Sequence, residues 1–203
     1  MNQGASQGYA LIHTAGKLFG IGVFKKLMRD FKLSDPRHAL LELSKGKLTT
    51  DASRHSGQGI FFTSRMFDQF ILDANGFSFC RFNKSDDWLF ESSEGSVGTS
   101  VLMKIGQRAT QLIANVMSEY SAELHDYGFT KTHVPLELAR YEGEQLVSRS
   151  QARRLLARVD QFKEVWLDFK GLTTIGQAFA DEVFRVFKLN HPNIVIIPAN
   201  ANE

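Results

Sequence analysis

Residues 148–169, SRSQARRLLARVDQFKEVWLDF, contain a helix signal followed directly by a strand signal. Ser148 and Gln151 have the spacing of a capping box, in which each side chain bonds to a backbone N–H group that the helix start leaves free. Apolar residues then recur at helical spacing as far as Phe162, and Val165–Phe169 is an apolar run typical of a strand. The stretch predicts a helix that leads into a strand, the repeating unit of an α/β fold.

The same alternation continues on both sides of this stretch. Residues 134–138 alternate as a strand, and Pro135 favours an edge position because proline has no N–H group for a second neighbour. Residues 175–188 have a helical pattern, and residues 193–197 form a continuous apolar run, typical of a strand buried on both faces. The β-α-β-α-β order predicts a small sheet with parallel pairs in a unit that starts near Gly128.

The first 128 residues follow a less regular pattern. Residues 1–19 show no period and are interpreted as an atypical leader. Two helices are predicted at residues 20–32 and 35–43, with Asp35 as the N-cap and Pro36 in the first turn. Three short β-runs follow the helices, and the polar turns between them favour an antiparallel meander. A loop is predicted at residues 44–59 and a third helix at 60–70. Three β-runs are predicted at 77–82, 87–91 and 98–105, with turns at 84–87 and 94–96 between them. A long connecting helix is predicted at 107–127, ended by Gly128.

Composition limits the classes of function. The 203 residues include 24 Lys and Arg against 22 Asp and Glu, and a net charge of +2 is too balanced to indicate nucleic-acid binding. The single cysteine, Cys80, excludes an internal disulfide, and the six histidines lack the paired spacing of a metal site. No run approaches the roughly 18 apolar residues of a membrane helix. We therefore expect a cytoplasmic protein with no metal, membrane or nucleic-acid partner.

Three glycine-containing turns precede a helix or a strand. Glycine lets backbone N–H groups approach an anion, and a helix N-terminus adds positive partial charge, so such turns can bind phosphate. The competing interpretation is that each glycine simply allows a turn, because short glycine motifs are weak signals. The candidate nucleotide-binding residues are Gly20, Gly22, Gly57, Gly59, Gly98 and Thr99.

In this order the glycine turns resemble the C-terminal half of the Bergerat-type (GHKL, histidine-kinase-like) ATPase domain of gyrase and histidine kinases. The resemblance covers residues 20–106, with residues 44–56 in place of the ATP lid, "HSGQGIFFTSRMFD" as the second glycine box and "GSVGTSVLMKI" as the closing strand. The family's adenine-binding aspartate is replaced by Leu18, which cannot accept a hydrogen bond. The residues before Leu18 contain no Asp or Glu, and Asn2 is their only Asn. The resemblance therefore implies that the general base and the magnesium ligand are missing, and catalysis by this chain alone is not expected.

Residues 129–203 resemble the STAS-like domain of unknown function that bacteria and phages carry behind such an ATPase-like domain. The match rests on "GEQLVSRSQARRLLARVDQFKEVWLDFKGLTTIGQAFADEVFRVF" and "HPNIVIIPANAN". In the related anti-sigma-factor antagonists, an Asp-x-x-Gly element precedes a helix start whose serine is phosphorylated by a partner kinase. Residues 168–171 keep the first element, whereas Gly176-Gln177-Ala178-Phe179 has no hydroxyl at the serine position.

Thr173 and Thr174 lie just before that position and are the candidate substitutes for the serine, although Thr174 is equally well placed as a helix cap. The resemblance implies that this segment forms a switch or partner surface. The residues of that surface are Asp168, Lys170, Gly171, Thr173, Thr174 and Gln177.

The expected fold class is α/β (α+β), a partial Bergerat-type sandwich followed by a small STAS-like mixed sheet with helices. The expected divisions are residues 1–19, 20–106, 107–128 (a connecting helix) and 129–203. The expected function is that of a bacterial or phage regulatory or signalling protein that binds a protein partner and has a degenerate ATP-binding region. The alternative is a GHKL-type ATPase or kinase completed by another chain or an upstream segment. Only then would ATP and magnesium bind; no other cofactor is expected.

Overall fold

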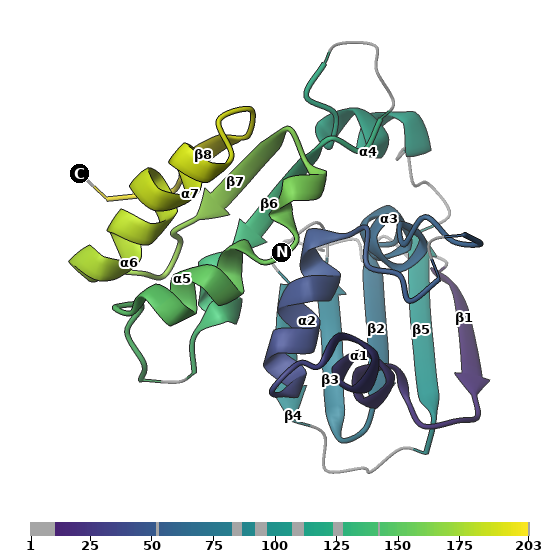
Figure 1. Ribbon diagram of the computed structural model, residues 1–203. Helices are drawn as coiled ribbons and strands as arrows, with labels where there is room; N and C mark the ends of the chain where they lie inside the picture. Colours follow the sequence, from purple (N-terminus) through teal and green to yellow (C-terminus); the bar gives the residue numbers. More distant parts are fainter. Residues whose placement is uncertain are drawn as a thin grey trace, which may run out of the picture.

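The computed structural model describes residues 11–51, 53–82, 87–91, 97–106, 112–123, 128–141 and 143–202, which form two sheets with helices (Figure 1). The first sheet is antiparallel, in the order β1-β5-β2-β3-β4, and the second has the order β6-β7-β8. The expected mixed class is confirmed. The strands of the first sheet are β1 (Leu11–Leu18), β2 (Gln69–Ala74), β3 (Phe77–Phe82), β4 (Asp87–Glu91) and β5 (Thr99–Gly106).

Strand β1 corrects the interpretation of residues 1–19 as a patternless leader. It pairs with β5 over its whole length, from Leu11 opposite Gly106 to Leu18 opposite Thr99. Residues 14–18 are exposed on both faces of this edge strand, so their sequence carries no alternation of buried and exposed positions. Pairing with β5 forms the strand without leaving that signature.

Strands β3, β4 and β5 lie where the three β-runs were predicted, but their pairing differs. The antiparallel meander runs through β2, β3 and β4, whereas β5 inserts between β1 and β2. The predicted helix 60–70 is also too long: α3 (Gly59–Met66) ends at an extended Phe67, and Phe70 belongs to β2. The predicted turn residues 84–86 and 94–96 lie outside the described residues.

Helices α1 (Val23–Phe31), α2 (Pro36–Lys45) and α3 cover one face of the first sheet (Figure 1). Asp35 caps α2 by accepting a hydrogen bond from the His38 N–H group at 2.9 Å, and Pro36 occupies the first turn, as predicted. The apolar sides of these helices pack on alternate residues of the strands. The fully buried members of this core include Phe24, Leu40, Phe70, Leu72 and Phe79.

The connecting helix is shorter than predicted. Helix α4 (Ile113–Glu119) ends at Tyr120, and residues 107–111 and 124–127 lie outside the described part of the chain. The carbonyl of Tyr120 accepts bonds from the N–H groups of Thr130 and Lys131, which turns the chain toward the second sheet. Gly128 therefore does not end this helix, contrary to the prediction.

The second sheet is parallel and consists of β6 (Lys131–Pro135), β7 (Glu164–Asp168) and β8 (Val195–Ala199). One 3₁₀ turn, η1 (Leu136–Ala139), follows β6, and another, η2 (Val159–Gln161), precedes β7. Helix α5 (Arg149–Leu156) and the continuous helix made by α6 (Gln177–Asp181), the π-turn η3 (Glu182–Val186) and α7 (Phe187–Asn190) connect the strands.

Two predictions about this sheet are confirmed and two are corrected. The capping box of Ser148 and Gln151 is present, and β6 is an edge strand. However, β6 ends at Pro135 and continues as η1. Strand β8 is also an edge strand with partly exposed residues, so the apolar run 193–197 does not mark a strand buried on both faces.

One apolar core connects the two sheets. It contains Leu41 of α2 and Phe61 of α3 together with Phe129, Val165 and Phe179 from the last third of the chain. The hydroxyl of Thr132 in β6 also donates to the carbonyl of Lys45 at the end of α2, at 2.8 Å. The division near Gly128 stays a prediction, and the packing on its two sides is continuous.

Candidate partner-binding site

The structure brings four of the six candidate nucleotide-binding residues together where β1 ends and α1 begins. The φ of Gly22 is 84° and that of Gly98 is 86°, values that side chains rarely allow, and a Cβ at Gly98 would lie 2.0 Å from the Leu18 carbonyl oxygen. Gly20 lies two residues before Gly22, and Thr99 follows Gly98.

Two of the free N–H groups at this helix start already have partners. The Val23 N–H group donates to Thr99 Oγ1 at 2.9 Å, and the Lys25 N–H group donates to Asn75 Oδ1 at 3.0 Å. These are donors that would otherwise face a bound phosphate. The contacts support the interpretation that these glycines serve close packing.

Gly57 and Gly59 belong to another part of the fold. A Cβ at Gly57 would lie 2.6 Å from the backbone of Lys47, and Gly59 is the first residue of α3. In Figure 1, α3 lies at the end of the sheet opposite to the end of β1. Nucleotide binding by the six residues stays a prediction.

The predicted switch surface forms the connection between β7 and α6. Asp168 is the last residue of β7, and its carboxylate accepts hydrogen bonds from the Lys170 N–H group at 2.9 Å and from Asn200 Nδ2 at 2.8 Å. Arg140 donates to the Gly171 carbonyl at 3.3 Å, and Asn202 Nδ2 donates to the Thr173 carbonyl at 3.0 Å. Arg140, which follows η1, and two residues after β8 thus hold this connection in place.

Several side chains of this segment remain accessible, whereas Phe169 and Leu172 are buried. Lys170, Thr173, Thr174 and Gln177 are all exposed. Thr174 does not cap the helix, because α6 starts at Gln177 with Gly176 as its N-cap and no side-chain cap bond. The capping prediction for Thr174 is therefore wrong, and its hydroxyl is left on the surface.

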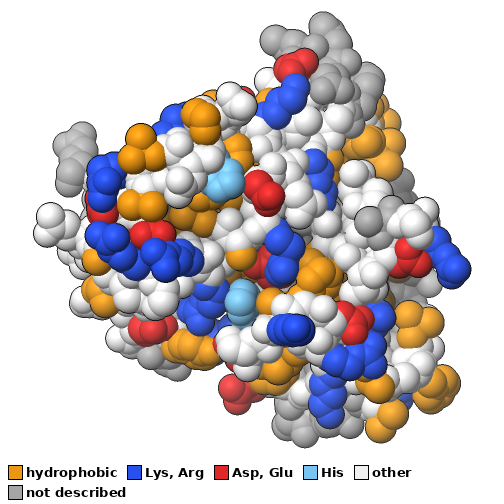
Figure 2. Space-filling view, viewed as in Figure 1, with side chains coloured by type: hydrophobic (Ala, Val, Ile, Leu, Met, Phe, Trp, Pro, Cys, Tyr) orange, Lys and Arg blue, Asp and Glu red, His pale blue; other side chains and the backbone are white. Residues whose placement is uncertain are grey.

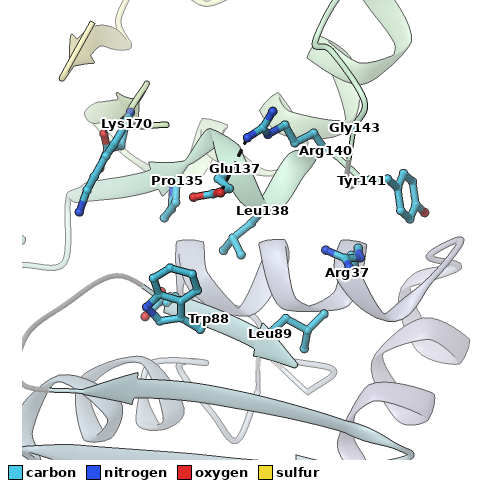
Figure 3. A pocket seen from close by; sticks show the side chains of 12 residues that line it. Arg37, Trp88, Leu89, Pro135, Glu137, Leu138, Arg140, Tyr141, Gly143 and Lys170 are labelled. Atoms are coloured by element: carbon cyan, nitrogen blue, oxygen red, sulfur yellow. Dashed lines mark hydrogen bonds and ion pairs between the residues drawn. The ribbon is translucent and has the colours of Figure 1, made fainter. Parts of the chain in front are cut away.

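A cleft of about 340 Å³, here called the central cleft, lies beside this connection. Asp168 at the end of β7 and Lys170 just after it line the cleft, and so do residues of the first sheet. Figure 3 shows Leu138 pointing from η1 toward Trp88 and Leu89 of β4, with Arg37 of α2 nearby. Further residues of the same wall as Leu138 are Glu137, Arg140 and Tyr141.

The charged residues around the central cleft differ in how closely they are bound to residues of opposite charge. Asp87 is buried and binds Arg81 at 2.8 Å and Arg65 at 3.4 Å. Glu137 lies 3.8 Å from Arg140 and is half exposed. Tyr141 donates its hydroxyl proton to Asp35 at 2.5 Å, and this hydrogen bond, together with burial, raises the pKa of Tyr141 above its usual value. The cleft thus has cations and carboxylates on the same walls.

A second hollow of about 290 Å³, here called the Phe184 groove, also borders the connection. It is lined by Thr173, Thr174, Ile175 and Phe184, and by residues after β8. Phe184 is 42% exposed, and its ring is stacked on the buried Phe169 at 6.4 Å between centroids. Residues at the connection therefore line both a charged cleft and a largely apolar groove.

The neighbouring helices present a balanced charge. Arg149 and Arg153 of α5 pair with Asp181 at 2.9 Å and Glu182 at 2.7 Å on the following helix. Figure 2 shows this intermixing of basic, acidic and apolar side chains across the visible face. Within the described residues, His, Cys, Asp and Glu side chains form no group of three that could hold a metal ion. No described helix is long and apolar enough to span a bilayer.

Sequence reasoning predicted Asp168 and Lys170 but missed the opposite walls of the central cleft. Arg37, Trp88 and Tyr141 are each separated by more than 50 residues in the sequence. They come together only in the folded protein. Trp88 had one usable signal: it is a large aromatic residue on a short strand, directly after two aspartates. It is 45% exposed and stacked on Phe90.

Comparison with known families identifies one segment of the chain. Residues 151–203 match the profile of a STAS-like domain of unknown function. The match covers most of α5, then β7, the helix 177–190 and β8, and it includes every residue of the predicted switch surface. No curated protein and no solved structure matches the chain. The resemblance of residues 20–106 to a Bergerat-type ATPase stays a prediction, whereas a STAS-like domain is present at the C-terminal end.

Proposed function

We propose that this chain is a regulatory interaction protein whose STAS-like part binds a protein partner through the β7–α6 connection. The observation that carries the proposal is the contrast between a fixed backbone and accessible side chains. Hydrogen bonds from Arg140, Asn200 and Asn202 hold the connection, while the residues Lys170 and Gln177 are exposed. A preordered surface loses less conformational entropy when a partner binds.

The Phe184 groove supports the same proposal. Aromatic side chains, Phe included, are enriched in protein interfaces relative to the rest of the protein surface. Phe184 is a partly exposed aromatic residue of this kind, and it lines the groove together with Thr173 and Thr174. In this proposal, phosphorylation of either threonine would add negative charge at the interface and change partner affinity.

The test is quantitative affinity capture from cells of the source organism with the tagged full-length chain. Lys170→Glu and Phe184→Ala should each reduce the recovery of the same specific partner at least about tenfold, in line with the loss of an interface anchor. Lys25→Glu and Phe19→Ala are the matched controls, because both residues are exposed in the first part of the chain, Lys25 on α1 and Phe19 directly after β1. Equal recovery by all four variants would contradict the proposal.

The two threonines are tested separately. Thr173→Ala and Thr174→Ala remove the hydroxyl groups, and Thr173→Glu and Thr174→Glu imitate part of the charge of a phosphate. If phosphorylation is the switch, one alanine variant and its glutamate counterpart will differ in partner recovery. Identical recovery by all four variants would exclude threonine phosphorylation as the switch. The proposal that this surface binds a partner would still stand.

A further inference from the structure

Strand β4 provides a second binding element beside the proposed surface. It is the last strand of the first sheet and, within the described residues, it pairs with β3 alone. Its other edge therefore has backbone N–H and C=O groups available to another strand. Asp87, Trp88 and Leu89 of this strand line the central cleft.

The shape of the central cleft suits an extended chain. One wall is the edge of β4, and the facing wall is η1 with the residues that follow it (Figure 3). Trp88 and Leu89 on one side and Pro135 and Leu138 on the other supply apolar contacts for side chains of such a segment. Edge-strand pairing of this kind gives affinity through main-chain bonds and specificity through side-chain pockets.

Arg37 determines which chemistry fits the cleft. Among the described residues it forms no ion pair, and its guanidinium lies 5.8 Å from the Tyr141 ring centre. The other charges differ: Asp87 is bound by Arg65 and Arg81, and Arg140 has Glu137 within 3.8 Å. An acidic side chain of the bound segment would give Arg37 the ionic partner that the described part of the chain does not supply.

We infer that the central cleft binds an extended, acidic segment of a partner protein, which adds to β4 as a sixth strand and places a carboxylate against Arg37. The inference rests on the proposed function, because it names the binding mode of the partner next to the β7–α6 connection. It differs in the residues it uses, since Arg37 and Trp88 belong to the first sheet and its helices.

The experiment uses the full-length chain and a random ten-residue peptide library displayed on phage. Selected peptides should be enriched in Asp and Glu, and fluorescence polarisation should show that Arg37→Ala weakens the best peptide about tenfold or more, as expected for a charge-assisted hydrogen bond. Arg54→Ala is the matched control, because Arg54 is exposed on a loop and its side chain is 79% accessible. Thermal unfolding of both variants shows that each is folded.

Two further measurements decide the binding mode. Backbone N-methylation of the peptide should abolish binding at every second position and be tolerated between them, because alternate N–H groups of a strand face its neighbour. Arg37→Glu should regain affinity for a peptide in which the key acidic residue is replaced by Lys. The inference is overturned if the library yields no binder, if N-methylation shows no alternation, or if Arg37→Ala and Arg54→Ala bind alike.

The outcomes separate this inference from the proposed function. A cellular partner that is lost in Lys170→Glu but retained in Arg37→Ala and Trp88→Ala would preserve the proposed function and overturn pairing with β4. Peptide binding that needs Arg37, together with unchanged cellular capture by Lys170→Glu and Phe184→Ala, would preserve pairing with β4 and overturn partner binding through the β7–α6 connection.

Discussion

The starts of α5 and α1 satisfy their free N–H groups with residues at very different distances along the chain. At α5, Ser148 accepts a bond from the Gln151 N–H group, and the Gln151 side chain accepts one from the Ser148 N–H group. At α1, the acceptors are Thr99 and Asn75, which lie 76 and 50 residues away from their donors. The last third of the chain is therefore specified mainly by local signals, and the first part depends on contacts that only folding creates.

The largest expected effect lies where these two regions meet. Glu42 of α2 is 1% exposed and binds Lys45 at 2.8 Å and Arg158, which follows α5, at 2.8 Å. Glu42→Gln leaves two cations without their carboxylate, and loss of one member of a buried ion pair costs about 3–5 kcal/mol. Urea unfolding should show this loss in one cooperative transition. Glu119→Gln, on an exposed position of α4, is the control.

Two separate transitions, or a loss similar to that of Glu119→Gln, would mean that the regions are less closely joined than their shared core indicates.

Lys45 gives a pH test of the same junction. Burial lowers the pKa of its ammonium group from 10.5 to about 8, although the Glu42 carboxylate acts in the opposite direction. Between these two values the unfolded chain binds more protons than the folded chain, so the Lys45 contribution to the unfolding free energy rises with pH. Below pH 8, the full cost of burying the charged form is present.

The measurement is the difference in urea midpoint between the wild type and Lys45→Met at several pH values from 7 to 10.5. The wild type should gain stability relative to the variant across this window. A difference that does not change with pH would contradict the proposed cost of the buried ammonium group.

The two helix starts can be compared directly by mutation. Ser148→Ala should destabilise the protein by about 1 kcal/mol, because it removes a side-chain cap. Thr99→Val should cost about as much, because it leaves the Val23 N–H group without its acceptor. Thr174→Ala should change the unfolding free energy by less than about 0.5 kcal/mol, because Thr174 caps nothing.

These three values come from chemical denaturation. A loss at Thr174 equal to that at Ser148 would show that Thr174 caps α6 in solution, and a negligible loss at Thr99 would show that the distant contact at α1 is unimportant.

The smallest expected effect concerns ATP. A ligand that binds the folded state raises its stability by RT ln(1 + [L]/Kd). Since Thr99 and Asn75 occupy donors at the start of α1, millimolar Mg-ATP should leave the melting temperature unchanged. A reproducible upward shift in melting temperature would revive the GHKL-type alternative.

Particular residues show how far the sequence allowed the fold to be predicted. The capping box, the parallel order and strands β3, β4 and β5 followed from local pattern. Strand β2 was missed although Asn75-Gly76, with φ values of 57° and 82°, is a strong hairpin signal. Strand β1 had no such signal, because its residues 14–18 are exposed on both faces.

The candidate site divides in the same way. Its half on the β7–α6 connection was predicted from a contiguous segment, Asp168 to Gln177. Its other half, with Arg37 and Trp88, depends on the packing of the first sheet against η1. No residue spacing in the sequence predicts that packing.

Site-specific photo-crosslinking tests the central claim most directly. A benzophenone amino acid replaces Gln177 on the proposed surface or, in the control, Ser118 on the exposed side of α4. After irradiation of cells of the source organism, the Gln177 position should yield one discrete covalent adduct with a partner protein, and the Ser118 position should yield none. Equal adducts at both positions, or none at Gln177, would contradict partner binding through the β7–α6 connection.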